Sequence, residues 1–289
     1  MRHHATSPLW RLFQDARVAT DVVGDGITRL TVSSRWTRRL GFDVSAYVVD
    51  DLMVDTGFAH ARQAVLDAVD GHPLVAICCS HNHEDHTGNC RPLATIHECP
   101  VYIRHHRLRY GEGVRRLKPY RAWWWGSPGR FDAEEMPEVV VGGERRLRAL
   151  PAPGHSMNHV VLWEEASGTV FTGDLFISPG ASAVMTQENP YDLVDSLRRV
   201  AAVGPRLMLT GHGTAIEDPV PRLLAKADRV EAAAARAVEL HGAGMPERAI
   251  VRDLFSNGHA KDRWLELMTQ GEFSRVNFVR AAVLHARER

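Results

Sequence analysis

Short apolar runs broken by polar residues dominate the first hundred positions. Residues 27–32 and 45–55 are rich in β-branched and other apolar side chains, and the pattern AYVV, DD, LMVDTG predicts a hairpin. The pattern then predicts a helix, a buried strand, a second helix and another strand at residues 59–69, 74–79, 87–96 and 100–103. Strands that alternate with helices in this way predict an α/β layer structure.

After Met136 the pattern returns to strands. Four short runs, EVVV, RLRAL, HVVLW and TVFTGD, are followed by a predicted helix over 191–203, with Asn189 as its cap and Pro190 at its first position. Residues 206–213 predict a last strand that runs into a loop, and from Asp218 onward every apolar pattern is helical. We therefore predict a catalytic domain over residues 1–216 and a helical module over 217–289.

The amino-acid composition indicates an ordinary globular protein. The chain has 289 residues, of which 44% are hydrophobic and 24% charged, as in ordinary globular proteins. Lys+Arg and Asp+Glu both total 35, so the overall charge does not favour a polyanionic or membrane partner. We expect a cytoplasmic location because no apolar stretch resembles a signal peptide or a membrane span. Without any CxxC spacing, we expect the four cysteines to be reduced, structural thiols.

The stretch HNHEDH (81–86) carries the first candidate chemistry. In an extended segment, His81 and His83 point the same way, while Asp85 and His86 follow in the turn into the next helix. Imidazole nitrogens and carboxylate oxygens together suit zinc, manganese or iron. Glu84 alternates away from this side, and we expect it to be solvated.

Three later positions share one context, a turn glycine beside a strand. They are His155 in PAPGHS, Asp174 in FTGD and His212 in LTGHG. A single histidine or aspartate in a turn is usually structural. Three of them in this context, after HNHEDH, predict one metal site, because each strand end brings a ligand beside a glycine that permits close backbone approach.

These motifs resemble those of the metallo-β-lactamase superfamily, in particular its binuclear hydrolase branch, which includes glyoxalase II. The matching pieces are VDTG (54–57), HNHEDH, PGHS, TGD and GHG, in the family's order, over roughly residues 20–215. The resemblance implies an α/β fold, an αββα sandwich of two mixed sheets with helices on both outer faces, here with a C-terminal helical extension.

The resemblance also implies the roles of individual residues. It places His81, His83 and His155 on one metal ion, Asp85, His86 and His212 on the other, and Asp174 between the two. Asp55 would orient a ligand from behind, although a turn aspartate is an alternative reading. The cofactors implied are two divalent metal ions, zinc first, with iron or manganese as alternatives.

Two cations about 3.5–4 Å apart would turn a water into a hydroxide aimed at a carbonyl or phosphoryl centre. Asp85 or a water could then protonate the leaving group. The sequence contains no GxSxG nucleophile motif. Asp174 stands where zinc β-lactamases generally have cysteine, and Ile177 stands where the superfamily's acyl-homoserine lactonases carry tyrosine, so neither activity is favoured.

A basic, aromatic segment at 104–136 is the candidate for substrate choice. Between Arg104 and Arg130 there are eight Lys or Arg residues and one acidic residue, Glu112. We expect this insertion to form a lid, with Arg121 on an anionic group and Trp123, Trp124 and Trp125 on an acyl chain or base. The alternative is a solvated insertion whose tryptophans pack on the body of the protein or at a subunit interface.

The leading hypothesis is a metal-dependent hydrolase of a small anionic ester or thioester, such as a glutathione or coenzyme A thioester. The alternative is a phosphodiesterase or endoribonuclease with the same site. Nucleic acid is the less favoured partner because acidic and basic residues nearly balance in 217–289. A mononuclear-iron enzyme resembling persulfide dioxygenases and a non-catalytic metal-binding module rank lower. A homo-oligomer is an open alternative to a monomer, and no membrane partner is expected.

Overall fold

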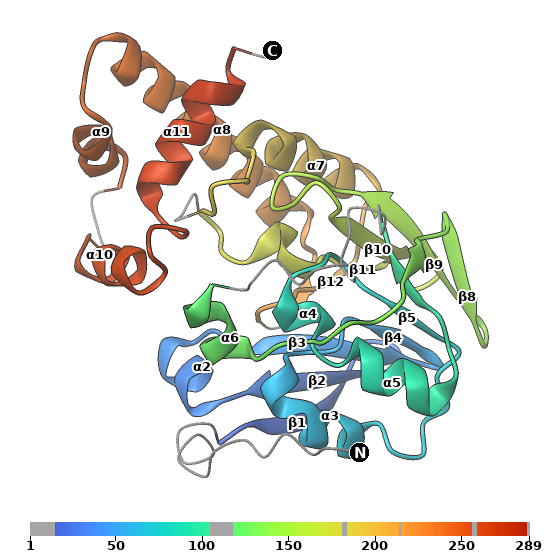
Figure 1. The fold of residues 1–289 in the computed structure, drawn as a ribbon. Helices are drawn as coiled ribbons and strands as arrows, with labels where there is room; N and C mark the ends of the chain where they lie inside the picture. Colours follow the sequence, from blue (N-terminus) through green and yellow to red (C-terminus); the bar gives the residue numbers. More distant parts are fainter. Residues whose placement is uncertain (1–14, 105–117, 181–183, 214, 256–258, 288–289) are drawn as a thin grey trace. The chain divides into compact units, whose positions relative to one another are not determined.

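The computed structural model describes residues 15–104, 118–180, 184–213, 215–255 and 259–287. The chain divides into two compact units; the seven-stranded sheet lies in the first unit, and most of the six-stranded sheet lies in the second (Figure 1). The first unit comprises residues 1–147 and 211–214, and the second comprises 148–210 and 215–289. The short segment 211–214 therefore belongs to a different unit from the residues on either side of it.

The first sheet contains seven strands among the described residues. In spatial order, which is also the sequence order, they are β1 (Arg17–Val23), β2 (Ile27–Ser33), β3 (Val44–Val49), β4 (Leu52–Val54), β5 (Ala76–Cys78), β6 (Val101–Ile103) and β7 (Glu134–Glu135). The strands from β1 to β4 pair antiparallel, and those from β4 to β7 pair parallel. The carboxyl ends of β4, β5 and β6 therefore meet at one edge, where α/β proteins place their sites.

Helices pack on this sheet through one apolar cluster. The helical elements of the first unit are α2 (Arg35–Leu40), η1 (Ala59–Ala61), α3 (Arg62–Ala68), α4 (Glu84–Thr87), α5 (Cys90–His97) and α6 (Pro119–Trp125). Val65 of α3, Leu93 of α5 and Trp125 of α6 join Leu30 and Ile77 of the sheet in this core. All four cysteines are buried and form no disulfide, and the interpretation that they are structural thiols stays a prediction.

The second sheet contains six strands among the described residues. Their order is β13 (Ile216–Glu217), β12 (Leu207–Leu209), β11 (Thr169–Phe171), β10 (Val160–Glu164), β9 (Arg145–Pro151) and β8 (Val139–Gly142). Only β11 and β12 pair parallel among the pairs described, and the division between the units falls within β9.

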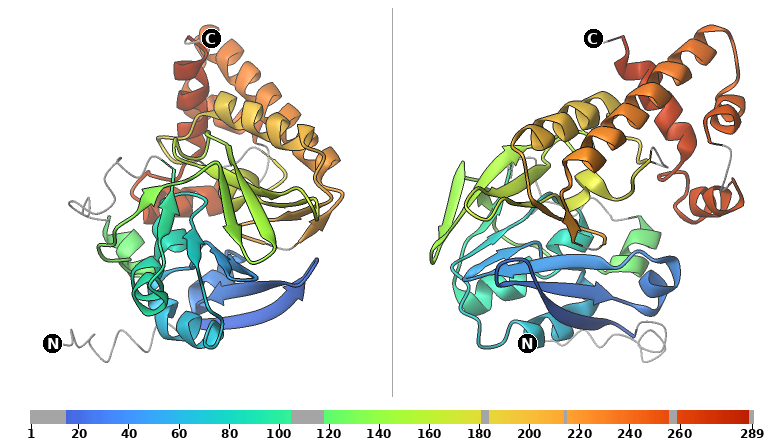
Figure 2. Two further views of the ribbon diagram at one scale, coloured as in Figure 1. Left: turned by 90° about the vertical axis from the view of Figure 1, so that its right-hand side faces the viewer. Right: turned by 180° about the vertical axis from the view of Figure 1, so that it is seen from behind.

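Helices make up the rest of the second unit. They are the 3₁₀ turn η2 (Gly173–Phe176) and the helices α7 (Pro190–Ala202), α8 (Val220–Gly242), α9 (Glu247–Leu254), α10 (His259–Met268) and α11 (Arg275–His285). Figure 2 shows α8 as a long helix that runs beside α7. The Asn189 side chain accepts hydrogen bonds from the Tyr191 and Asp192 amides, which confirms the predicted cap of α7.

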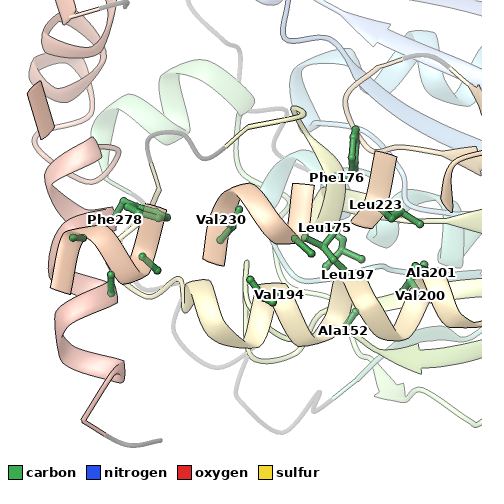
Figure 3. Close-up of a cluster of buried hydrophobic side chains, with 14 of the residues drawn as sticks. Ala152, Leu175, Phe176, Val194, Leu197, Val200, Ala201, Leu223, Val230 and Phe278 are labelled. Atoms are coloured by element: carbon green, nitrogen blue, oxygen red, sulfur yellow. The ribbon is translucent and has the colours of Figure 1, made fainter. Parts of the chain in front are cut away.

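One apolar cluster joins the second sheet to the C-terminal helices (Figure 3). Val194, Leu197 and Val200 recur at helical spacing on the inner face of α7 and contact Leu223 and other buried residues of α8. Phe278 of α11 belongs to the same cluster. Residues 217–289 thus share a core with residues 148–210. The boundary at 216/217 as a domain division stays a prediction.

Candidate metal centre

Asp55 is the buried carboxylate from which the first unit's site is built. It follows β4 directly, has a left-handed backbone conformation (φ 56°), and is 2% exposed. Its Oδ1 accepts a hydrogen bond from the Ser80 amide (2.7 Å), and its Oδ2 accepts one from the Ser80 hydroxyl (2.8 Å). These bonds join the ends of the parallel strands β4 and β5, and they fix the start of the HNHEDH stretch.

The same carboxylate orients His86. Its Oδ2 lies 2.8 Å from Nδ1 of His86, a fully buried residue on α4. Because a carboxylate only accepts, Nδ1 of the neutral imidazole carries the proton and Nε2 keeps its lone pair. Gly88 lets α4 approach closely, since a Cβ at that position would lie 2.4 Å from the backbone nitrogen of Ala59.

Asp85, His86 and His212 form a buried group suited to a metal ion. Each offers one ligand atom, and the three atoms lie within 4.8 Å of one another. Nε2 of His212 is 3.3 Å from Oδ2 of Asp85, while its Nδ1 lies 3.1 Å from the Asp43 carbonyl oxygen. The His212 ring also stacks on Phe42 at 4.1 Å. Both imidazoles are therefore held by Nδ1 with Nε2 turned to Asp85, as expected for residues that hold a cation.

His81 and His83 are the other two histidines of this unit's stretch. Nε2 of His81 lies 2.8 Å from Nδ1 of His83, and Nδ1 of His81 lies 3.0 Å from the Ser80 hydroxyl. His81 is fully buried, while His83 is half-buried. The Ser80 hydroxyl also donates to Asp55. The Asp55 carboxylate therefore holds His86 directly and His81 through the Ser80 hydroxyl. The prediction that the two imidazoles lie together is confirmed.

The second unit contributes a separate pair, His155 and Asp174. His155 follows β9 and Asp174 lies in η2, which follows β11. Nε2 of His155 is 3.3 Å from Oδ2 of Asp174, and both residues are buried. The Asp174 amide donates to Nε2 of His159 (3.1 Å), so His159 positions the backbone of η2.

Two buried charged residues support this pair, and neither was predicted from the sequence. Oε1 of Glu188 lies 3.5 Å from Nδ1 of His155 and accepts a hydrogen bond from the Met185 amide (2.9 Å). Lys226 of α8 donates from Nζ to the Ser178 carbonyl oxygen (2.8 Å). Burial lowers the pKa of Lys226 to about 8, and the carboxylates of Glu188 and Asp174 oppose that shift.

The expectation that Glu84 is solvated is wrong. Glu84 is 5% exposed, and its carboxylate accepts hydrogen bonds from both Nε and Nη2 of Arg121, the second at 2.9 Å. Burial raises the pKa of Glu84, and the Arg121 guanidinium opposes this. Burial alone would lower the pKa of Arg121, but the Glu84 carboxylate more than offsets it. The alternation rule failed because the chain leaves the extended conformation at Glu84, the first residue of α4.

The three tryptophans lie on the helix α6. Trp125 is buried against Phe42 and Phe58, and Trp123 and Trp124 are half-buried. This arrangement agrees with the alternative in which tryptophans of the segment pack on the body of the protein. Four of the eight basic residues expected in the lid, Arg107, Arg109, Arg115 and Arg116, lie outside the described residues.

A family model for the metallo-β-lactamase superfamily matches residues 39–212, more than half of the chain. The chain therefore belongs to the metallo-β-lactamase superfamily, and it is a metal-binding hydrolase of that fold. The predicted fold class is thus confirmed, with two mixed sheets, helices packed on each and a C-terminal helical region.

Three curated relatives show similarity at low identity. The uncharacterized protein YobT of Bacillus subtilis is 27% identical, over 63% of this chain and 88% of its own. A hydroxyacylglutathione hydrolase of Rhodospirillum rubrum is 25% identical, over 67% of this chain and 70% of its own. An atrochrysone carboxyl ACP thioesterase of Aspergillus fumigatus is 26% identical, over 62% of this chain, but the match spans only about half (52%) of that protein.

Solved structures agree on the fold. A β-lactamase domain protein from Burkholderia ambifaria superposes with a TM-score of 0.65 at 18% identity, covering 93% of this chain and 89% of its own. The protein TTHA1623, solved in a di-iron-bound form, superposes with a TM-score of 0.52 at 25% identity, covering 62% of this chain and 92% of its own. In the described part of the chain, no helix combines the length and the apolar composition needed to cross a membrane.

Proposed function

We propose that this protein is a two-metal hydrolase of small anionic thioesters or esters. The observation that carries the proposal is the buried group of Asp85, His86 and His212, with both imidazoles held at Nδ1 so that Nε2 faces Asp85. Two imidazole nitrogens and a carboxylate oxygen are a donor set that suits zinc, iron or manganese.

We propose that the remaining predicted ligands complete two sites. His81, His83 and His155 would hold one ion, the group above would hold the other, and Asp174 would bind both. The pairs His81–His83 and His155–Asp174, each close within its own unit, support this assignment. The di-iron form of TTHA1623 supports two ions rather than one. When bound, divalent metal ions lower the pKa of water and stabilise negative charge that develops on a carbonyl or phosphoryl oxygen.

The chain's own residues perform three tasks in this proposal. Asp55 keeps the proton of His86 on Nδ1, and the Asp43 carbonyl oxygen does the same for His212. Glu188 is placed to hold the corresponding proton of His155. Asp85 has its Oδ2 on the side of the His212 Nε2 and is the residue that we propose to return a proton to the leaving group.

The names of two relatives support a thioester substrate. One is a hydroxyacylglutathione hydrolase and the other is a thioesterase, and an acylglutathione is itself a thioester. An anionic substrate is supported by the basic composition of residues 104–130. The predictions of a cytoplasmic location and a possible homo-oligomer stand unchanged as parts of the proposal.

The test is thiol release from a panel of glutathione and coenzyme A thioesters. It is measured on zinc-loaded protein, on protein stripped with a chelator, and after zinc, iron(II) or manganese is added back. Release that chelation abolishes and metal restores is the expected result. Release that survives complete metal removal contradicts the proposal. If fully loaded protein releases no thiol, the thioester assignment is wrong, and phosphodiesters become the next substrates to assay.

A further inference from the structure

Glu84 carries an acidic side chain in the middle of the ligand stretch. It is the first residue of α4 and stands between His83 and Asp85, two of the proposed ligands. Its carboxylate is buried, and a buried carboxylate without a partner costs several kcal/mol. A neutral or solvent-facing residue would avoid this cost, so a specific contact must compensate for it.

Arg121 provides that contact from 37 positions away in the sequence. Nε donates to Oε1 of Glu84 and Nη2 donates to Oε2, so the guanidinium fork binds both oxygens at once. Two parallel hydrogen bonds fix the orientation of the carboxylate as well as its position. Arg121 is itself only 8% exposed, so water does not compete for the pair as it does at a surface.

The helix that carries Arg121 is itself fixed in the first unit. At the end of α6, the Trp125 ring lies 5.4 Å from Phe58 and is buried in the apolar core. Nε2 of His60 lies 3.2 Å from the carbonyl oxygens of both Ala122 and Trp123, where the last turn of the helix needs donors. Arg121 therefore extends from a helix with a defined position.

A second path leads from α6 to the ligand group. The Trp125 ring lies 6.2 Å from Phe42, and Phe42 stacks on the His212 ring at 4.1 Å. Through Arg121 the helix contacts the turn that carries Asp85 and His86, and through Trp125 and Phe42 it supports His212. The helix α6 therefore contacts the group of Asp85, His86 and His212 by two routes, one through Glu84 and one through Phe42.

We propose that Arg121 is a positioning residue for the metal centre, which through Glu84 fixes the turn that carries His83, Asp85 and His86. This inference rests on the proposed function in so far as these residues bind metal. It assigns Arg121 a role other than the substrate contact predicted from the sequence. The reason is that two of the guanidinium's nitrogens already bind a buried carboxylate.

The first experiment measures Zn²⁺ affinity by competition with a chromogenic chelator for wild type, Arg121→Met, Arg121→Lys, Glu84→Gln and the double variant Glu84→Gln/Arg121→Met. Outer contacts of metal ligands typically change affinity about 10–100-fold. We expect Arg121→Met to lose Zn²⁺ affinity by a factor of that order. Arg121→Lys should lose less, because it keeps the charge but not the two-pronged guanidinium. The double variant should bind Zn²⁺ no more weakly than the weaker-binding of the two single variants, because both changes remove the same contact.

Arg62→Met is the matched control, because Arg62 is an exposed arginine on α3 of the same unit. Its Zn²⁺ affinity should equal that of wild type. Unfolding of the metal-free proteins in urea is measured in parallel. If Arg121→Met lowers stability but binds Zn²⁺ within twofold of wild type, the pair is merely structural and the proposal is overturned. Should Arg121→Met fail to fold, Arg121→Lys and Glu84→Gln still decide the question.

Kinetics separates positioning from substrate binding. On the best thioester of the panel, a positioning role lowers kcat with little change in KM. A substrate contact instead raises KM with unchanged Zn²⁺ affinity, and that result also overturns the proposal. Zn²⁺ affinity is measured without any substrate. If the protein does not hydrolyse thioesters, the proposed substrate is therefore refuted, while the positioning role of Arg121 is still tested by the Zn²⁺ affinities.

Discussion

Replacing Asp55 by asparagine should weaken metal binding about 10–100-fold, the range for partners that orient a ligand from behind. By affinity arithmetic, this loss equals about 1.4–2.7 kcal/mol. The change is nearly isosteric and removes the charge. The left-handed backbone at this position (φ 56°) is retained, because asparagine tolerates that conformation as aspartate does.

The expected loss comes from the hydrogen bonds around the carboxylate. Asp55 accepts three, from the Ser80 amide, the Ser80 hydroxyl and Nδ1 of His86. An asparagine amide placed with its nitrogen toward His86 forces the imidazole proton onto Nε2, the atom proposed to bind metal. The opposite orientation points the amide nitrogen at the Ser80 amide, so that two donors face each other. Either orientation misplaces a donor at a buried site.

Chelator competition for Zn²⁺ and urea unfolding of the metal-free protein measure the two consequences. We expect Asp55→Asn to lower the free energy of unfolding by roughly 1.5–3 kcal/mol, which is the usual contribution of a hydrogen bond to a charged group. Asp67→Asn is the control, because Asp67 of α3 is exposed and its carboxylate accepts a hydrogen bond from the Gln63 side chain of the same helix. If Asp55→Asn binds Zn²⁺ within twofold of wild type, Asp55 does not set the His86 tautomer, and the reasoning fails.

Three further predictions concern stability. The pKa of Lys226 falls from its ordinary value of 10.5 to about 8 on folding, so between these pH values the unfolded chain binds more protons at this group, and its contribution to the free energy of unfolding rises with pH by up to about 3 kcal/mol. Burial raises the pKa of the Cys78 and Cys99 thiols, which contribute with the opposite sign above about pH 9, so the test is the difference in urea unfolding between metal-free wild type and Lys226→Met from pH 7.5 to 10.5; a difference that does not change with pH would refute the shift. Gly88→Ala should lower Tm sharply or prevent folding, because its Cβ would lie 2.4 Å from the Ala59 nitrogen; an unchanged Tm would contradict the close approach. Leu197→Ala, which empties a fully buried position between the second sheet and α8, should cost about 2–5 kcal/mol in urea unfolding; a loss under 1 kcal/mol would mean that this core is loosely packed.

The sequence correctly predicted the features that depend on residues close together in the chain. The α7 cap formed as expected, because Asn189 and Pro190 act on the amides next to them. The closeness of His81 and His83 followed from their spacing of two residues. Recognition of the ligand motifs depended on their order along the chain, and the family match over 39–212 covers all of HNHEDH, PGHS, TGD and His212.

The residues that were missed have distant partners. Glu84 binds a side chain 37 positions later, and nothing near HNHEDH marks Arg121 as its partner. Glu188 and Lys226 lie in segments whose local patterns, a loop before α7 and an amphipathic helix, indicate no role beside His155 and Asp174. An acidic residue and a lysine in such positions are usually solvated, so composition alone favours the wrong environment.

Several short elements were not predicted, and two of them, β1 and α6, show a different reason. The strand β1 is mostly exposed, so it lacks the alternation of apolar and polar residues that marks a half-buried strand. The helix α6 has only seven residues, and its run of three tryptophans has weak helix propensity. Its formation depends on tertiary contacts, above all the burial of Trp125 and the Arg121–Glu84 pair.

The segment 211–214 has a consequence for biosynthesis. It belongs to the first unit, where the Ser45 amide donates to the Gly211 carbonyl oxygen (2.7 Å) and His212 lies on Phe42, yet the ribosome makes it after most of the second unit's sheet. Domains generally fold as they emerge, amino-terminal part first. A nascent chain that stops at residue 147 would hold Asp85 and His86 without His212. The first unit thus cannot assemble the proposed ligand group of Asp85, His86 and His212 until more than sixty further residues have been translated, so we expect this group to bind metal only late in synthesis of the chain.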